Sequence, residues 1–293
     1  MKQKLREIKH RSLYYYKKNL PEFLYEDYIS KRYKKSIGED LNWSQPLRYT
    51  EKIQIAKLYN FNQLKSKLTD KVEVRSWISD KIGEQYLIPA LKIYNHAEEI
   101  DFEILPDKFV IKTNHGSGTN IIVSDKRKLD IKKTVKTLKK WMSKDFTYMS
   151  DFEKHYSSIK PKIIIEEFLE TPEGDLQDFK FLCFDSKVYY CWVDIGRFTD
   201  HKRNFYDLNW NLQPFTQAYS NSEEKIEKPV NFEKMISIAE TLCQGLDHVR
   251  VDLYNIDGKI YFGEMTFTNG AGYERISPKE FDEKIGELWE LKK

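Results

Sequence analysis

The chain is 293 residues long and is 40% hydrophobic, 14% aromatic and 32% charged, which excludes a disordered or fibrous protein. This length suffices for one large or two moderate domains, each with its own core. Its 49 basic and 46 acidic residues leave a net charge of only +3, so bulk charge gives no reason to expect nucleic acid as a partner.

Three features of the sequence bear on the cellular compartment. Cys183, Cys191 and Cys243 show no CxxC spacing and leave an odd thiol, as expected in a reducing compartment rather than in a secreted disulfide framework. No apolar run approaches the roughly 20 residues of a membrane span, and the first residues lack the apolar core of a signal peptide. We therefore expect a cytoplasmic protein.

Residues 1–35 carry eleven Lys or Arg residues against four Asp or Glu residues. Their apolar residues recur at roughly helical spacing, which predicts a basic amphipathic helix with Leu5, Ile8, Leu13, Tyr16 and Leu20 on its apolar side. Such a helix either packs on the main body with its charges in solvent or contacts an anionic membrane surface or acidic polymer. The second alternative would make the protein peripheral at the inner face of a membrane.

Helices are predicted next, followed by a series of strands. The segments TEKIQIAKLYNF and DKVEVRSWISDKIG have apolar residues three and four apart, and Ile88-Pro89 ends this helical region. A hairpin follows at 109–113 and 119–123, and then a lysine-rich helix at about 130–143. IIIEEFLE is typical of a short buried strand, and DFKFLCFDSKVYYCWVDI of a hairpin that turns at Asp185-Ser186. This β-β-α-β-β order predicts an α+β protein.

The last third begins with NFEKMISIAETLCQGL, an amphipathic helix that Gly245 is expected to end. HVRVDLYNIDGKIYFGEMTF then predicts two strands joined by residues 255–258. Asp252 and Glu264 fall inside these strand patterns, where a buried carboxylate is unfavourable unless a partner compensates it. Facing each other across the hairpin, they could share a hard divalent cation such as Mg²⁺, which also binds phosphate oxygens. Alternatively, Asp252 simply pairs with Arg250 on an exposed face.

A glycine-rich loop follows the strand that ends near Lys112, in the stretch KFVIKTNHGSGTNIIV. Two glycines beside a lysine suggest that the backbone approaches an anion, with Lys112 and the backbone N–H groups of residues 115–119 around phosphate oxygens. The loop is not a Walker motif, because no Lys-Ser or Lys-Thr follows the glycines and no helix is predicted there.

The end of the strand in IIIEEFLE offers a second type of contact. Adenine needs an apolar slot, exposed backbone groups and a nearby carboxylate, and Glu166, Glu167, Phe168 and Leu169 could provide them. The alternative is an ordinary strand end with a solvated acidic pair.

Together these pieces resemble the ATP-grasp superfamily, and specifically the TupA-like ATP-grasp proteins of bacterial cell-surface polysaccharide clusters. The resemblance runs over residues 43–273 and rests on six motifs in order: DKVEVRSWI, FVIKTNHGSGTNII, IIIEEFL, DFKFLCF, GRFTDHKRNFYDLNW and VRVDLYNIDGKIYFGEMTFTNGAG. It implies an ATP-grasp fold, in which two α+β lobes enclose an ATP cleft after a helical N-terminal segment. The corresponding divisions are a helical segment at 1–65, a small lobe at 66–163 and a large lobe at 164–293.

The resemblance also implies roles for individual residues. The predicted ATP-binding residues are Lys71, Lys112, His115, Gly116, Ser117 and Gly118 at the phosphates, Glu166, Glu167, Phe168 and Leu169 at adenine, Asp178 at the ribose, and Asn204. The predicted catalytic cations around the transferred phosphoryl group are Lys180, Arg197, Arg203 and Arg250, and the predicted magnesium ligands are Asp252, Glu264 and Thr266.

One motif departs from the superfamily pattern. Many ATP-grasp ligases have Glu-x-Asn after the last strand, where this chain has Glu264-Met265-Thr266. The neutral hydroxyl of Thr266 is a weaker ligand than an amide oxygen, which puts a second magnesium ion in doubt, and Asn269 is a candidate substitute.

The implied function is that of an ATP-dependent carboxylate–amine ligase that acts through an acyl phosphate, with ATP and Mg²⁺ as cofactors. Its implied partners are a carboxylate acceptor on a surface polysaccharide or its precursor and an amine donor. A second hypothesis is a kinase that phosphorylates a saccharide hydroxyl, with Asp200, His201 or Asp207 as the general base. A third is a glycosyltransferase in which Asp252 and Glu264 hold a metal diphosphate.

Overall fold

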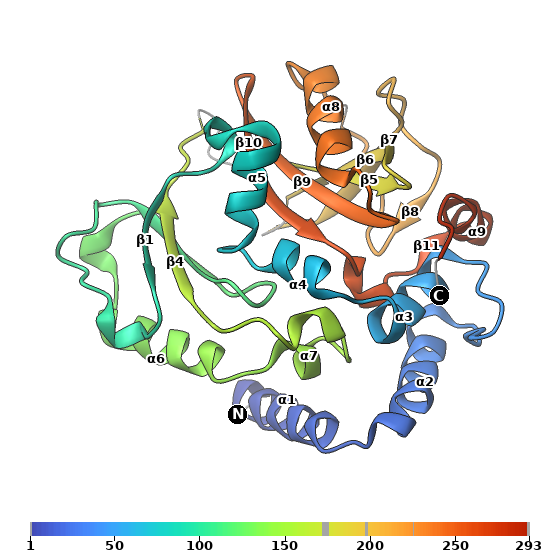
Figure 1. Ribbon diagram of the computed structural model, residues 1–293, viewed down its shortest axis with the longest axis horizontal. Helices are drawn as coiled ribbons and strands as arrows, with labels where there is room; N and C mark the ends of the chain where they lie inside the picture. Colours follow the sequence, from blue (N-terminus) through green and yellow to red (C-terminus); the bar gives the residue numbers. More distant parts are fainter. Residues whose placement is uncertain (1, 172–175, 197–198, 225, 292–293) are drawn as a thin grey trace.

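The computed structural model describes residues 2–171, 176–196, 199–224 and 226–291. Over these residues the chain forms two larger antiparallel sheets, each covered by helices, with the first two helices at one side of the molecule (Figure 1). The prediction of an α+β protein is confirmed. None of the helices in this part of the chain is long and apolar enough to cross a membrane.

The first sheet has four strands in the order β1-β4-β2-β3. They are β1 (Ala90–Tyr94), β2 (Phe109–Thr113), β3 (Asn120–Val123) and β4 (Ile163–Glu167). The β-branched residues of β4 are fully buried, as suits a strand with a neighbour on each side. Helix α6 (Ile131–Met142) covers one face, where Leu138 joins Phe109 and Ile111 in one core cluster.

The second sheet has five strands in the order β10-β9-β5-β6-β7. They are β5 (Asp178–Phe184), β6 (Lys187–Ile195), β7 (Lys202–Tyr206), β9 (His248–Ile256) and β10 (Lys259–Thr266). Helix α8 (Phe232–Cys243) buries Phe232, Met235 and Leu242 in the core beneath this sheet. A small two-stranded sheet pairs β8 (Thr216–Gln217) with β11 (Ile276–Ser277).

Two hairpin turns in the second sheet follow the sequence closely. The φ angles are +45° at Asp185 and +69° at Ser186, and +50° at Asp257 and +85° at Gly258. Positive φ at both central residues is what a two-residue turn between twisted strands requires. The first turn lies where it was predicted, whereas the second is shorter than the predicted 255–258 because β9 continues to Ile256.

The remaining helices surround the two sheets. The α-helices are α1 (Lys2–Lys18), α2 (Tyr25–Ile37), α3 (Tyr49–Tyr59), α4 (Gln63–Thr69), α5 (Val74–Ile82), α7 (Phe146–Met149) and α9 (Lys279–Glu287). The short 3₁₀ helices are η1 (Glu22–Leu24), η2 (Glu84–Tyr86), η3 (Ala97–Glu99), η4 (Lys126–Lys128), η5 (Lys154–Tyr156) and η6 (Asn269–Gly272). Residues 1–35 were expected to form one helix, but the helix ends before Pro21. A proline disfavours the α conformation of the residue that precedes it.

Two further expectations about the first sheet need correction. Strand β1 was not predicted, because ALKIY is short, follows a proline and contains Lys92; its pairing with β4 makes it a strand. The predicted division between residues 163 and 164 falls inside β4. Because β4 pairs with both β1 and β2, the change of sheet comes after this strand.

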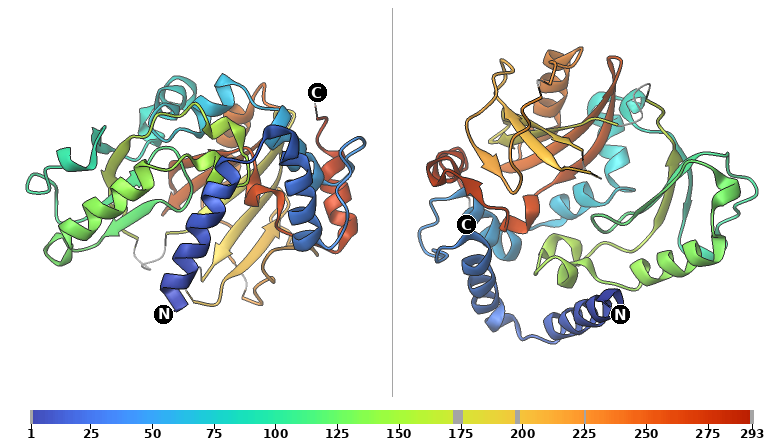
Figure 2. Two further views of the ribbon diagram at one scale, coloured as in Figure 1. Left: turned by 90° about the horizontal axis from the view of Figure 1, so that it is seen from below. Right: turned by 180° about the vertical axis from the view of Figure 1, so that it is seen from behind.

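Helices α4 and α5 lie between the two sheets, as the views from both sides show (Figures 1 and 2). The turn between β2 and β3 is connected to the second sheet by Lys71, which follows α4. Lys71 contacts both this turn and β10. This arrangement leaves the ends of β2, β9 and β10 facing one region between the sheets.

Candidate active site

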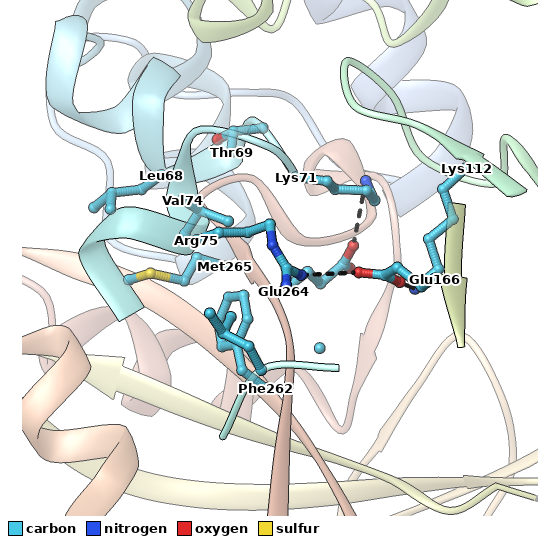
Figure 3. Close-up of a pocket in the computed structure, with 12 residues that line it drawn as sticks. Leu68, Thr69, Lys71, Val74, Arg75, Lys112, Glu166, Phe262, Glu264 and Met265 are labelled. Atoms are coloured by element: carbon cyan, nitrogen blue, oxygen red, sulfur yellow. Dashed lines mark hydrogen bonds and ion pairs between the residues drawn. The ribbon is translucent and has the colours of Figure 1, made fainter. Parts of the chain in front are cut away.

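Side chains from β2 and from α5 bring positive charge to this region. Lys112 Nζ, near the end of β2, lies 2.6 Å from Glu166 Oε2 on the neighbouring strand β4. Arg75 Nη1, from α5, lies 3.3 Å from the other carboxylate oxygen of Glu166. Figure 3 shows both contacts together with the ion pair between Lys71 and Glu264. The carboxylate of Glu166 therefore holds two cations at the front of the cleft.

The glycine-rich turn is fixed by backbone conformation and by packing. Gly118 has a φ of +69°, a conformation that glycine adopts without strain. At Gly116, an added Cβ atom would lie 2.8 Å from the ring of Phe146. Lys71 Nζ donates a hydrogen bond of 2.7 Å to the Gly116 carbonyl oxygen and lies 3.8 Å from Glu264 Oε2. Lys71 thus connects the turn of the first lobe to β10 of the second.

The second lobe places charged residues opposite one another on adjacent strands. In register, Lys180 on β5 faces Asp252 on β9, and Asp252 faces Glu264 on β10. Arg250 Nε lies 2.6 Å from Asp252 Oδ1, and Arg250 Nη2 lies 2.7 Å from both Asp252 Oδ2 and Glu264 Oε1. Lys180 Nζ lies 3.1 Å from Asp252 Oδ2 and also pairs with Asp178. The pairing of Asp252 with Arg250 is therefore present, but at a side chain that is buried in the cleft rather than on an exposed face.

These contacts decide the charge of the two carboxylates. Burial disfavours ionisation of Glu264, but Lys71, Arg250 and Lys180 outweigh it and lower its pKa to about 2. Burial raises the pKa of Asp252 to about 6, against the opposing effect of Arg250 and Lys180. Both carboxylates are ionised at pH 7, so the rear of the cleft carries acids in close contact with cations.

Two cavities lie along this cleft and share Lys112, Asn120 and Tyr254. The first, of about 330 Å³, is lined by Lys71, Lys112, Gly116, Ser117, Gly118, Thr119, Asn120, Asp178, Lys180, Arg250, Asp252, Tyr254, Gly263 and Glu264. The second, of about 410 Å³, is lined by the apolar residues Ile88, Val110, Ile122, Phe168, Leu169 and Leu176 and by the charged residues Lys108, Lys112, Glu166, Glu167 and Glu170. Small-molecule sites span roughly 300–1,000 Å³, so the pair can hold a ligand with one anionic and one apolar end.

Most of the predicted site residues come together around these cavities. The first cavity gathers the residues predicted at the phosphates, the ribose and the metal, except for His115 and Thr266. The second gathers all four residues predicted at adenine. Their individual roles stay predictions, because the cavities give the positions of these side chains and not their functions.

Four predicted residues lie away from both cavities. The side chain of His115 lines a separate cavity behind the turn, together with Tyr14 and Phe146. Arg203 is held by Asp194, at 2.7 Å, and by Glu274, at 2.8 Å.

Asn204 Nδ2 donates to the Tyr206 hydroxyl at 3.2 Å, and its Oδ1 accepts from the Ser222 N–H at 2.8 Å. Thr266 donates from its hydroxyl to Glu264 Oε1 at 3.2 Å. Arg197, which was predicted to be catalytic, lies outside the described residues.

Sequence analysis missed Arg75 and Tyr254 as residues of this site. Arg75 belongs to the motif DKVEVRSWI, four residues after Lys71, but its carboxylate partner Glu166 is 91 residues away. Tyr254 lines both cavities. The sequence does carry a signal for it, because alternate residues of a strand share a face and Tyr254 is two residues after Asp252.

Comparison with known proteins places this arrangement in a class. Two α+β lobes around a cleft are the arrangement of the ATP-grasp fold, and both are present here. The sequence matches the TupA-like ATP-grasp family over residues 51–290, and the chain belongs to this family. Among curated proteins, none matches the chain.

Solved structures of ATP-grasp enzymes resemble the chain at low sequence identity. D-alanine–D-alanine ligase from Bacillus anthracis in complex with ATP is 18% identical, with a TM-score of 0.42 over 71% of this chain and 56% of that one. The same enzyme from Helicobacter pylori is 13% identical, with a TM-score of 0.40 over 76% and 61%. N5-carboxyaminoimidazole synthase from Aspergillus clavatus is 12% identical, with a TM-score of 0.38 over 68% and 44%. The chain thus spans 44% to 61% of the length of these proteins.

The donor set at the rear of the cleft fits a magnesium ion. Asp252 and Glu264 supply ionised oxygens from facing positions on two strands, and Mg²⁺ prefers such oxygens with phosphate and water completing its coordination. Within the described residues, no group of three His, Cys, Asp or Glu side chains gathers at one point. Asp252 and Glu264 would be the residues to hold such an ion, and in this structure Arg250 donates to the oxygens of both.

Proposed function

We propose that the chain is an ATP-dependent carboxylate–amine ligase that modifies a bacterial surface polysaccharide or its precursor through an acyl phosphate. The observation that carries this proposal is one cavity lined both by Lys112 and the glycine-rich turn of the first sheet and by Asp252 and Glu264 of the second, with Lys71 between them, in a member of an ATP-grasp family. The reaction would take place in the cytoplasm, where ATP is available.

The proposed binding mode assigns each end of ATP to one cavity. The apolar cavity beside Phe168 and Leu169 takes adenine, and Asp178 accepts hydrogen bonds from the ribose. Lys71, Lys112 and the backbone N–H groups of the glycine-rich turn neutralise and orient the phosphates. This mode uses the apolar lining of one cavity and the charged lining of the other.

Phosphoryl transfer depends mainly on positioning and charge neutralisation. An acceptor carboxylate oxygen would attack the γ-phosphorus, ADP would leave, and an amine would then attack the acyl carbon and displace phosphate to form an amide. Arg250 and Lys180 would stabilise the charge on the phosphoryl group, and their position on neighbouring strands that line the cavity supports this role. Magnesium, when bound, would supply further neutralisation of the phosphate oxygens.

The test is a trapping assay with uronic acids as acceptors. The protein is incubated with ATP, Mg²⁺ and a panel of uronic acids, with hydroxylamine in place of the amine. An acyl phosphate would yield a hydroxamate and ADP in equal amounts, with the acceptor and ATP both required. Absence of hydroxamate across the panel, with protein that binds ATP, would contradict the ligase proposal.

One observation favours a kinase as the second candidate. His201 Nε2 lies 3.1 Å from Asp194 Oδ1, the pairing that orients an imidazole as a general base. His201 lines neither cavity of the cleft, which is why we rank this function second. A phosphorylated saccharide without hydroxamate in the same assay would support the kinase, and preference for a UDP-sugar over ATP in calorimetry would support a glycosyltransferase.

A further inference from the structure

Helix α1 presents two different sides, one to the protein and one to solvent. At 3.6 residues per turn, Tyr14 and Lys17 fall on one side of the helix, and Ile8, Tyr15 and Tyr16 fall roughly on the opposite side. The burial of these side chains follows the same division, since Tyr14 and Lys17 are buried while the other three are exposed. Part of the apolar surface of this helix therefore points away from the molecule.

The inner side of α1 is firmly attached to the body. Lys17 Nζ lies 2.7 Å from Asp151 Oδ1. The Tyr14 hydroxyl accepts a hydrogen bond of 3.2 Å from the Asp145 N–H, and Lys144 Nζ lies 4.1 Å from the centre of the Tyr14 ring. These contacts hold the last turns of the helix, while its beginning extends beside the body in the view from below (Figure 2). A partner that binds the outer side of α1 would therefore hold the rest of the protein as well.

The outer side combines apolar side chains with positive charge. Ile8 is 55% exposed and Tyr16 is 56% exposed. Lys9 and Arg11, which flank Ile8 in the sequence, are exposed as well. The sequence of α1 contains seven Lys or Arg residues and one acidic residue. Tyr15 contacts Lys144 and Tyr16 contacts the ring of Tyr28, but Ile8 and Tyr16 each remain more than half exposed.

We propose that the outer side of α1 docks the protein on an anionic lipid bilayer. A helix that lies in the membrane interface carries apolar and aromatic side chains on one side with Lys and Arg along the flanks, and anionic lipids attract each such cation. An acidic polysaccharide would satisfy the charges, but it would give no role to the exposed Ile8 and Tyr16. The bilayer accounts for both features, so it is the partner that the structure favours.

The experiment is co-sedimentation of the full chain with vesicles. Vesicles of phosphatidylcholine with about 30% phosphatidylglycerol are compared with pure phosphatidylcholine, at low and at physiological salt. We expect binding only to the anionic vesicles, and we expect Ile8→Ser/Tyr16→Ser and Lys9→Gln/Arg11→Gln each to lower the bound-to-free ratio about tenfold. No substrate is needed, so the result does not depend on the proposed ligase activity.

Matched controls come from other exposed positions of the same chain. Leu47→Ser/Val230→Ser removes two exposed apolar side chains outside α1, and Lys132→Gln/Lys136→Gln removes two exposed charges from the basic helix α6. Both controls should bind vesicles like the wild type. Absence of binding to anionic vesicles would overturn the proposal. A second result would also overturn it: the wild type and Ile8→Ser/Tyr16→Ser bind anionic vesicles equally well, and both also bind dextran sulfate. That result would identify an acidic polymer as the partner.

Discussion

At the scale of single residues, the cleft shows how buried charges are compensated by one another. Arg250 donates to Asp252, Glu264 and Asn269, the last at 2.7 Å. An isolated ionised side chain in such a place would be strongly unfavourable, whereas a paired and hydrogen-bonded one is not. Under the proposed function, a triphosphate and a metal ion would contact the same side chains that here contact one another.

Lys112 is the residue for which the proposal makes the sharpest prediction about binding. Lys112→Ala should raise the Kd for ATP at least tenfold, because the side chain supplies a charge to the phosphates in a cleft partly closed to water. Glu166 would keep Arg75 as a partner, so the fold should survive. Titration with a fluorescent ATP analogue measures the effect, and Lys92→Ala, an exposed lysine of the same sheet, is the control. An unchanged Kd would refute the assignment of Lys112 to the phosphates.

Asp252 and Glu264 should affect turnover more than nucleotide affinity. Asp252→Asn and Glu264→Gln keep the shape of each side chain but remove the charge proposed to hold magnesium at the transferred phosphoryl group. We expect kcat in the hydroxamate assay to fall at least a hundredfold, with less than a fivefold change in the Kd for ATP.

The control for both substitutions is Asp257→Asn, in the turn of the same hairpin, where asparagine also tolerates positive φ. It should leave kcat unchanged. A full retention of kcat in Asp252→Asn would show that this carboxylate has no part in catalysis.

At the scale of secondary-structure elements, the glycine-rich turn depends on a contact from another part of the chain. The ring of Phe146, at the start of α7, occupies the space that a side chain at residue 116 would need. Gly116→Ala should therefore displace the turn and raise the Kd for ATP several-fold. Phe146→Ala in the same chain should restore part of the affinity, because it removes the clash.

The double variant distinguishes packing from a general loss of stability. Thermal melting of the wild type, Gly116→Ala, Phe146→Ala and the double variant shows whether each is folded. If Gly116→Ala binds ATP like the wild type, or if Phe146→Ala worsens it, the packing argument is wrong.

The same scale shows what the sequence could predict and what it could not. Elements with strong local patterns, such as β2, α6 and the β5–β6 hairpin, were predicted to within a residue or two, because turn chemistry and periodicity act over a few residues. Strand β1 depends on pairing with β4, more than 60 residues away, and its own sequence gives no sign of that partner. The division of residues 1–35 into two helices had a local signal in Pro21, which the regular apolar spacing concealed.

The candidate site follows the same rule. Residues inside compact motifs, such as Lys112 and Asp252, were gathered by the structure in one cleft. Arg203 was predicted to face the phosphoryl group, but the structure shows it bound to Asp194 and to Glu274, which is 71 residues away. Contacts between distant segments decide where a long cationic side chain points, and no spacing rule gives them.

At the scale of the whole molecule, the core contains titratable groups that make stability depend on pH. Burial lowers the pKa of His155 and of His248 to about 3, with a further contribution from Lys65 at His155. Because the folded state keeps these imidazoles neutral, they become protonated at a higher pH in the unfolded chain than in the folded chain. The loss of stability that they cause is therefore absent above pH 6.5, the ordinary pKa of histidine, and grows as the pH falls toward 3.

For one such histidine, the free energy of unfolding should fall by about 2 kcal/mol between pH 7.5 and pH 5. His155→Gln removes the titrating group, so the variant should lose about that much less stability over the same interval, whatever its stability at pH 7.5. Urea unfolding at several pH values measures the difference, in which other titrating groups cancel. His10→Gln, at an exposed position of α1, should show the pH dependence of the wild type. If His155→Gln does so too, His155 takes up a proton equally well in the folded and the unfolded chain, and its burial does not account for the loss of stability in acid.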